Sequence, residues 1–403
     1  MRPGPSKLTS HRVPSAPGVD VERFSGVSSC PGNALSSAGS APLKTLWDPA
    51  WFLQKGLARP IISTEKSDLK DEQIQLSHGS GGRLTHDLIR EVFHRHLSNP
   101  YLDLLSDAAV LPESRGRLAC TTDSYVIRPI FFSGGDIGKL AVCGTVNDLS
   151  MVGAQPLYLT AGFILEEGLP LSDLERVVSS MAETAKAAGV QVVAGDTKVV
   201  ERGSADKIFI NTAGIGWVPG NVDLSPRHIA PGDRILISGS VGDHGMAILS
   251  QREGLEFNTP LASDCAPLNG LVQSFVHHQG LRMMRDPTRG GLATSLVELA
   301  DASGLGFEIE EEKVPIHEGV RGACELLGLD PFYVANEGKL IAIVSREEAD
   351  SILATIQRHP LGETASLIGR VVETHPKKVV LRTFLGATRI MDMLTAEQLP
   401  RIC

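Results

Sequence analysis

The chain ends in a cysteine, Cys403, that follows Pro400, Arg401 and Ile402. A thiol on the last residue has no chain beyond it to pack over it, and a short tail can carry it into a cavity and withdraw it again. The neighbouring C-terminal carboxylate is expected to raise the pKa of this thiol, so a partner group must activate it as a nucleophile. A frayed chain end that happens to finish in cysteine explains the residue equally well. The choice between these two readings depends on the other residues of the chain.

A second set of residues is suited to binding a metal and a nucleotide. Aspartates stand at the ends of apolar segments in the first half of the chain, at Asp107, Asp123, Asp148 and Asp196. Carboxylates at strand ends, with the neighbouring Asn147, can converge on Mg²⁺ ions that bridge a triphosphate. A turn former or an N-cap explains most single aspartates of this kind. The four together, with Lys198 nearby, favour the nucleotide and metal site.

Several tight turns offer further chemistry. The Gly-rich residues 77–82 can cradle phosphate with their amides, although most such turns are only turns and no P-loop lysine follows. In the second half, residues 242–245 and 285–291 precede predicted helices; Asp243 is most simply an N-cap, and Arg289 with two glycines suits an anion. The turn at 336–338 presents Glu337, which can act as a general base.

Alternating strand and helix patterns must position these residues. They predict strands over 117–122, 190–194, 207–216, 234–238, 340–344 and 379–383, and helices over 137–151, from Ser172 to Gly189, and over 292–303. Ser172 with Glu175, and Ser345 with Glu348, are capping boxes. Strands and helices therefore mix in both halves of the chain, and residues 1–73 are a predicted disordered extension rich in Ser, Pro and Gly. The remaining predicted ranges are 74–225 for a first domain, 226–385 for a second domain and 386–403 for a mobile tail.

Composition limits the class of partner. The 403 residues carry a net charge of −9 with scattered basic residues, which argues against nucleic acid or an anionic membrane. No apolar run reaches the ~20 residues of a membrane span. The six cysteines show no C-x-x-C spacing. Cys120 and Cys324 are expected to be small buried hydrophobes, and the protein is expected to be cytoplasmic.

From about residue 74 to Cys403 the chain resembles the HypE family, the carbamoyl dehydratases of nickel–iron hydrogenase maturation. The resemblance is carried by residues 78–82, 121–126, 134–148, 163–169, 181–184, 195–200, 209–214, 242–245, 289–291, 324–329, 335–340 and the Pro-Arg-Ile-Cys end. HypE is similar to aminoimidazole ribonucleotide synthetase, selenophosphate synthetase and thiamine-monophosphate kinase. That superfamily implies an α+β fold of two domains. Residues 74–225 would be the ATP-binding and dimerisation domain and residues 226–385 the second α+β domain, in a homodimer with ATP near the interface.

The resemblance also implies a reaction. A HypF-type carbamoyltransferase loads a carbamoyl group onto Cys403, and ATP-dependent dehydration turns it into a thiocyanate. The nitrile passes to a HypC–HypD complex and becomes the cyanide ligand of the hydrogenase iron. ATP and Mg²⁺ are the expected cofactors. Cys403, Lys198 and Glu337 are the expected catalytic residues, and the expected nucleotide ligands are Asp107, Asp123, Asn147, Asp148 and Asp196, of which the four aspartates also bind the metal.

Two other functions remain open. A kinase or ligase of the same superfamily would act on a small free substrate and would not need Cys403. A scaffold that only docks maturation partners would need neither Lys198 nor the aspartates. Turnover and Mg·ATP binding distinguish the three.

Overall fold

The structure is a computed structural model that describes residues 73–79, 83–104, 109, 111, 116–255 and 260–393. All of them belong to one compact unit, Pro60–Cys403. The predicted disordered extension, apart from its last residue, lies outside the described residues, as do Asp107 and Cys403.

The described strands divide between two large sheets and one two-stranded ribbon. Their bounds are β1 Arg117–Tyr125, β2 Phe131–Phe132, β3 Gly135–Asp136, β4 Gln155–Glu166, β5 Gln191–Val200, β6 Ile208–Val218, β7 Arg234–Ile237, β8 Leu281–Arg285, β9 Gly306–Glu310, β10 Ile341–Val344, β11 Ser366–Val372, β12 Val379–Arg382 and β13 Thr388–Met391.

The described helices are mostly short outside the two that cover the first sheet. Their bounds are α2 Arg83–Leu88, α3 Arg95–Leu97, α4 Ile137–Met151, α5 Leu171–Ala188, α6 Asp243–Glu253, α7 Asn269–Phe275, α8 Gly291–Ser303, α9 Glu318–Leu327 and α10 Ala349–Ile356. Single turns of other helix types are η1 Leu76–Gly79, η2 Ile89–His94, η3 Leu102–Leu104, η4 Pro226–His228, η5 Glu311–Lys313, η6 Pro331–Tyr333 and η7 Pro360–Gly362.

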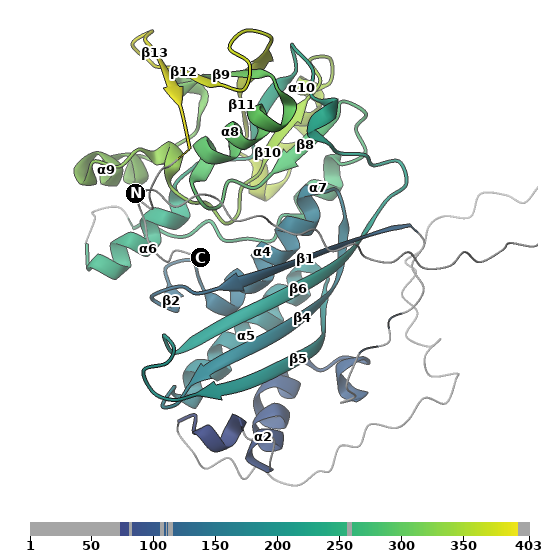
Figure 1. Ribbon diagram of the computed structural model, residues 1–403, viewed down its shortest axis with the longest axis vertical. Coiled ribbons are helices and arrows are strands. Elements are labelled where there is room, and N and C mark those ends of the chain that lie inside the picture. The colour runs from purple at the N-terminus through teal and green to yellow at the C-terminus, as the bar shows by residue number, and fades with distance from the viewer. Residues whose placement is uncertain are drawn as a thin grey trace, which may run out of the picture. The chain divides into compact units, whose positions relative to one another are not determined.

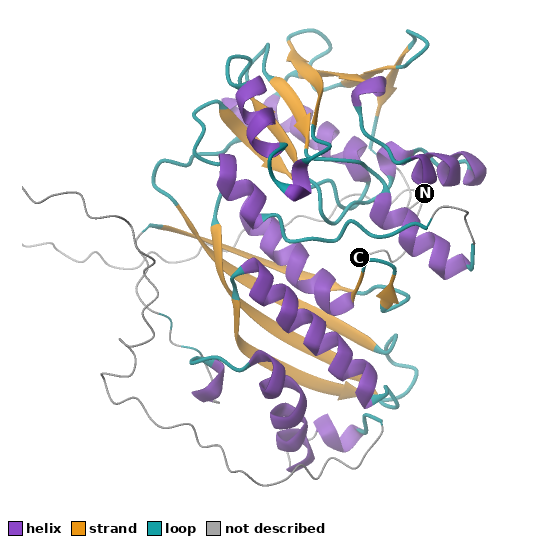
Figure 2. Cartoon of the chain, turned by 180° about the vertical axis from the view of Figure 1, so that it is seen from behind, coloured by secondary structure: helices purple, strands orange, loops and turns teal. Residues whose placement is uncertain are grey.

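The first sheet has the strand order β1-β6-β4-β5. Strands β4 and β5 are parallel because helix α5 joins them as a crossover, and the other pairs are antiparallel. Helices α4 and α5 pack on each other and on this sheet, and both views show them on one of its faces (Figures 1 and 2). The opposite face, here called the open face, carries the exposed side chains of Leu118, Cys120 and Ile164.

The second sheet has the order β13-β12-β9-β11-β7-β10-β8 among the described strands. Along β10 all four side chains, Ile341–Val344, are buried. Ile341 and Ile343 pack in the core that contains α8, whereas Ala342 and Val344 pack in the core that contains α7 and α10. A strand covered on both faces is apolar throughout, so this one lacks the polar alternation of a half-exposed strand.

The first sheet and helix α4 meet the second half of the chain through shared cores. Leu149 and Met151 at the end of α4 pack with Leu268 and Phe275 of the second half. A separate core joins the α4 and α5 side of the first sheet to residues of α6 and α9. The junction between the halves is therefore built from buried side chains on both sides.

Most predicted elements are present, and some local predictions are wrong. Helix α4 has its predicted bounds, but Ser172 does not cap α5. That helix begins at Leu171, with Pro170 as N-cap, because the Pro170 carbonyl accepts from the amides of residues 173 and 174. Cys120 is exposed, since strand alternation turns it to the open face, while Cys324 is buried as expected.

The predicted boundaries can be compared with the sheets. The first sheet ends with β6 at Val218 and the second begins with β7 at Arg234, on either side of residues 225–226. The predicted tail starts at residue 386, yet Thr388–Met391 pair with β12 as strand β13. The sheet therefore continues past 386.

Among the described residues, none of the helices has the length and apolar character needed to cross a membrane.

Candidate active site

Acidic side chains from both halves of the chain gather at the junction. Asp123 comes from β1 and Asp148 from α4, while Asp286 follows β8 and Glu337 precedes β10. Thr121 Oγ1 donates a hydrogen bond of 2.9 Å to Asp148 Oδ2 and so ties β1 to α4 at this point. The charges of these acids interact with one another. Four separate elements thus build one acidic cluster.

Repulsion and partial burial change the acidity of this cluster. Removal from water, and then the charge of Asp148, raise the pKa of Asp286 to about 6. Removal from water also raises the pKa of Asp148, which the Thr121 hydrogen bond opposes and the charge of Asp123 reinforces. Both carboxyl groups therefore hold protons more tightly than a solvated aspartate does.

Glu337 is the most deeply buried acid of the cluster, with 3% of its surface exposed. Its burial is the main reason that its pKa lies well above the usual range, and the nearby Cys265 and Asp286 add to the effect. A carboxyl group in such a site accepts a proton far more readily than one in water. Glu337 is therefore suited to accept a proton in acid–base chemistry.

The cluster fits a magnesium ion that is bound together with phosphate. Burial is the main cause of the raised pKa values of Asp148 and Asp286, and the charges of neighbouring acids add to it. A divalent cation bound beside these carboxyl groups would favour their charged forms. No group of three or more His, Cys, Asp or Glu within the described ranges can hold a metal by itself. Mg²⁺ typically takes one or two carboxylates and completes its shell with phosphate oxygens and water.

Asn147, a predicted nucleotide ligand, has a different role. Its side chain is buried, and Nδ2 donates to the carbonyls of Ala266 and Glu337 at 3.1 and 3.2 Å. Its Oδ1 accepts from the Leu268 amide at 2.7 Å. The amide group thus joins α4 to two loops of the second half, and its role as a nucleotide ligand stays a prediction.

Asp196 and Lys198 lie elsewhere on the sheet. Their side chains are exposed, and Lys198 Nζ lies 3.1 Å from Asp196 Oδ1. Strand register places Asp196 in one row across the sheet with Gly162, Asn211 and Ser124. Side chains alternate along a strand, so Asp196 shares the open face with Ser124, and Asp123 points to the opposite face.

The strands that carry these acids are also far apart. β5 and β1 are the two edges of the sheet, and three strand spacings separate them by about 14 Å. One chain therefore does not bring Asp196 to Asp123 and Asp148, and the convergence of these aspartates on Mg²⁺ ions stays a prediction. Asp196 and Lys198 instead line a cavity of about 380 Å³ on the open face, with Ser124 and Asn211.

Sequence reasoning missed three residues of the site. Asp286 lies in the turn 285–291, where an arginine and two glycines predict an anion site. A sequence pattern therefore pointed to this position. Asp264 and Lys339 carried none, because only the fold brings them beside Glu337. The predicted Asp107 and Cys403, and residues 80–82 of the Gly-rich turn, lie outside the described residues.

Comparison with known proteins gives the family of this fold and site. Residues 105–218 match the N-terminal domain of AIR synthase related proteins, and residues 230–382 match the C-terminal domain. Carbamoyl dehydratase HypE of Rhizobium leguminosarum bv. viciae is 53% identical over 340 residues, which cover 84% of this chain and 97% of that protein. The chain belongs to the HypE family. HypE proteins are enzymes, and the predicted resemblance is confirmed.

Solved structures of HypE confirm the predicted α+β fold of two AIR-synthase-type domains. A crystal structure of hydrogenase maturation protein HypE in complex with ATP matches with a TM-score of 0.79 at 53% identity, covering 82% of this chain and 99% of that one. HypE from a HypE–HypF complex matches with a TM-score of 0.67 at 51% identity, covering 76% and 99% of the two chains.

We predict that Asn147→Ala lowers the free energy of unfolding by about 3 kcal/mol, because three buried backbone groups lose their partner. Urea unfolding measures this difference. Asn221→Ala is the matched control, since Asn221 makes an exposed contact with His277. A loss for Asn147→Ala no larger than that of the control would contradict the structural role of Asn147.

The raised pKa of Asp286 predicts a pH-dependent effect in the metal-free protein. The folded state holds this proton more tightly than the unfolded state, so wild-type stability falls as pH rises from about 4 to about 6. Asp286→Asn removes that loss and is expected to be more stable than wild type by about 3 kcal/mol at pH 7, but not at pH 4. Urea titrations with a chelator test this, with the exposed Asp301→Asn as control. An equal difference at both pH values would contradict the assignment.

Proposed function

We propose that the chain dehydrates an S-carbamoyl group on its own Cys403 to a thiocyanate at the expense of ATP. The observation that carries the proposal is Glu337, a buried carboxyl group with a strongly raised pKa inside an acidic cluster, in a chain that belongs to the HypE family. The name of the Rhizobium relative, carbamoyl dehydratase, and the ATP complex of a HypE structure support it.

The reaction is written as two steps. The carbamoyl oxygen attacks the terminal phosphorus of ATP, ADP leaves, and the nitrogen gives up one proton. Glu337 then takes the remaining nitrogen proton, the C–O bond breaks, phosphate leaves with the bonding electrons, and the S–C≡N group forms. Oxide is a poor leaving group in water, and phosphorylation converts it into a good one. Mg²⁺ supplies charge neutralisation for the phosphates.

Lys198 orients the thiocarbamate or its phosphate from a second copy of the chain. A two-fold axis that runs along the strands, with open face against open face, lays β5 of one copy over β1 of the other. Such a homodimer lays Asp196 and Lys198 of one copy over the part of β1 around Ser124, the sequence neighbour of Asp123, in the other copy, which a single chain does not do. The exposed Leu118 and Ile164 on that face suit burial in the same interface.

Partners follow from the chemistry at both ends of the reaction. A HypF-type carbamoyltransferase loads Cys403, as the HypE–HypF complex of a relative suggests. A HypC–HypD complex accepts the nitrile for the hydrogenase iron. The reaction takes place in the cytoplasm, where a thiol remains reduced.

The direct test is intact-mass analysis after incubation with carbamoyl phosphate, a HypF-type partner and Mg·ATP. Wild type is expected to gain a carbamoyl group and then lose one water. Lys198→Ala and Glu337→Gln are expected to take up the carbamoyl group and bind ATP, but to lose water at least 100-fold more slowly, which is the usual size of an acid–base contribution.

Cys403→Ala is the matched control, because it removes the carrier and leaves the nucleotide site intact. Carbamoyl-dependent turnover of ATP by Cys403→Ala would contradict the tail mechanism and favour a kinase or ligase with a free substrate. A wild-type protein that binds no Mg·ATP would favour a scaffold.

A shared site predicts complementation between inactive variants. Asp123→Asn and Lys198→Ala damage different parts of the site, so a mixed dimer holds one intact site when the residues come from different chains. Random exchange of subunits is expected to restore about one quarter of wild-type activity. Lack of recovery, with mixed dimers demonstrated by differently tagged chains, would contradict the shared site.

A further inference from the structure

The loop between α6 and α7 runs along the junction and contacts both halves of the chain. We call residues 263–268 the strap. At one end, the Ser263 amide donates to the Ser133 carbonyl at 2.8 Å, and at the other the Leu268 amide donates to Asn147 Oδ1 at 2.7 Å. Both acceptors belong to the first half, so the strap is fixed there at each end.

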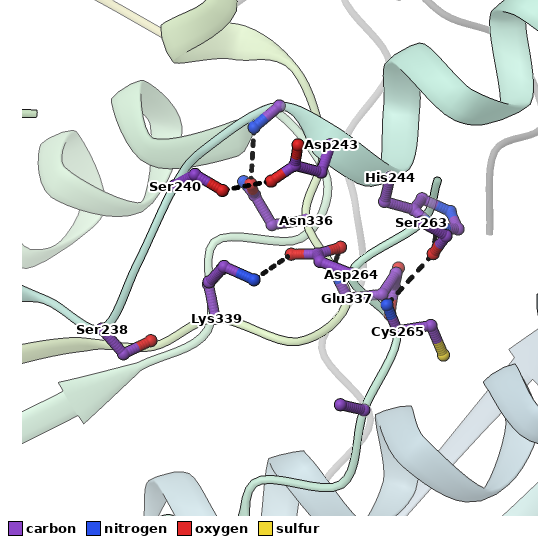
Figure 3. Close-up of polar contacts among 12 residues, drawn as sticks. Ser238, Ser240, Asp243, His244, Ser263, Asp264, Cys265, Asn336, Glu337 and Lys339 are labelled. Atoms are coloured by element: carbon purple, nitrogen blue, oxygen red, sulfur yellow. Dashed lines mark hydrogen bonds and ion pairs between the residues drawn. The ribbon is translucent and has the colours of Figure 1, made fainter. Parts of the chain in front are cut away.

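In the middle of the strap, Asp264 contacts the turn that carries Glu337 (Figure 3). Its Oδ1 accepts from the Glu337 amide at 3.0 Å, and its Oδ2 lies 3.1 Å from Lys339 Nζ. The side chains of Asp264 and Lys339 are 4% and 13% exposed. A Cβ on Gly338 would lie 1.9 Å from the Asp264 carbonyl oxygen, so the strap and the turn are in direct backbone contact.

The other side of the turn is anchored through Asn336. Its Oδ1 accepts from the Gly242 amide at 2.7 Å, and its Nδ2 donates to the Pro287 carbonyl at 2.9 Å. Glu337 therefore lies between two anchored neighbours, Asn336 on one side and the Lys339–Asp264 pair on the other. The backbone that carries the carboxyl group has little freedom to move.

The Glu337 carboxyl group also faces an unbalanced set of charges. The groups whose charge raises its pKa, after burial itself, are Cys265, Asp286, Asp264 and Asp123. Tyr125 lies close enough to interact with it. Lys339 is a cation buried beside these groups, and its position against Asp264 offsets part of their negative charge.

We propose that Asp264 and Lys339 are positioning residues for the base of the dehydration: their buried ion pair fixes the Glu337 turn and sets the charge that the Glu337 carboxyl group meets. This inference rests on the proposed function, and it adds two residues that do not touch the reacting atoms. The charges of Asp264 and Lys339 change the pKa of Glu337 in opposite directions, whereas both residues help to hold the same turn in place.

The experiment measures the rate of water loss from S-carbamoylated Cys403 by intact mass, in single turnover with Mg·ATP, from about pH 6 to pH 9. The rate rises with pH as Glu337 loses its proton. Lys339→Met leaves Asp264 uncompensated, so Glu337 keeps its proton to higher pH, and the profile is expected to move up by about one unit or more. Asp264→Asn removes a negative charge, and its profile is expected to move down.

Further variants separate charge from folding. Lys339→Arg keeps the positive charge and is expected to restore the wild-type profile. The double variant Asp264→Asn with Lys339→Met buries no unpaired charge, so it remains testable where a single variant unfolds, and its profile is expected to return toward wild type. Lys313→Met is the matched control, since it breaks an exposed pair with Glu310 at 2.8 Å.

The outcomes distinguish the inference from the function on which it rests. If wild type takes up the carbamoyl group and loses no water at any pH, the proposed function is wrong and the inference with it. If wild type reacts, but both single variants keep its profile or move in the same direction, the positioning role alone is wrong. A shift in Lys313→Met as large as that in Lys339→Met would also overturn it.

Discussion

Crowding of negative charge in a partly dry junction is the constraint on which the rest of this structure depends. Asp123, Asp148, Asp286 and Glu337 come from four elements, and folding brings them together although their charges repel. Each unit by which a pKa is raised corresponds to about 1.4 kcal/mol. The fold holds these acids in place with the Asn147 side chain, which joins the two halves, and with the Thr121–Asp148 hydrogen bond inside the first half. The same crowding makes the site attractive to a cation, and together with burial, which is the larger cause, it raises the pKa of Glu337.

The sequence predicts much of the fold because the signals are local. Helix α4 has its predicted bounds since Asp136 begins it with a capping carboxylate that accepts from two amides, and the residues that follow are apolar. Glu337 is found from the tight turn that carries it. Asp123 and Asp148 are found from their places at the ends of apolar segments.

Other features depend on information that no local pattern contains. Asn147 and Asp148 are neighbours in sequence, but successive residues on a helix point about 100° apart, so only Asp148 faces the acidic cluster. Asp196 looks like the other aspartates, yet strand order and register put it on the opposite face and edge of the sheet. The Asp264–Lys339 pair joins residues that are remote in sequence. It is visible only once the strap lies against the Glu337 turn.

The most direct test of the account follows the carbamoyl oxygen. Cys403 is loaded by the HypF-type partner from carbamoyl phosphate whose carbonyl oxygen is oxygen-18, and the inorganic phosphate released after addition of Mg·ATP is analysed by mass spectrometry. Transfer of the terminal phosphoryl group to the carbamoyl oxygen predicts one labelled oxygen in the phosphate for each nitrile formed. Unlabelled phosphate, with its fourth oxygen from solvent water, would mean that ATP is merely hydrolysed and would contradict the proposed chemistry.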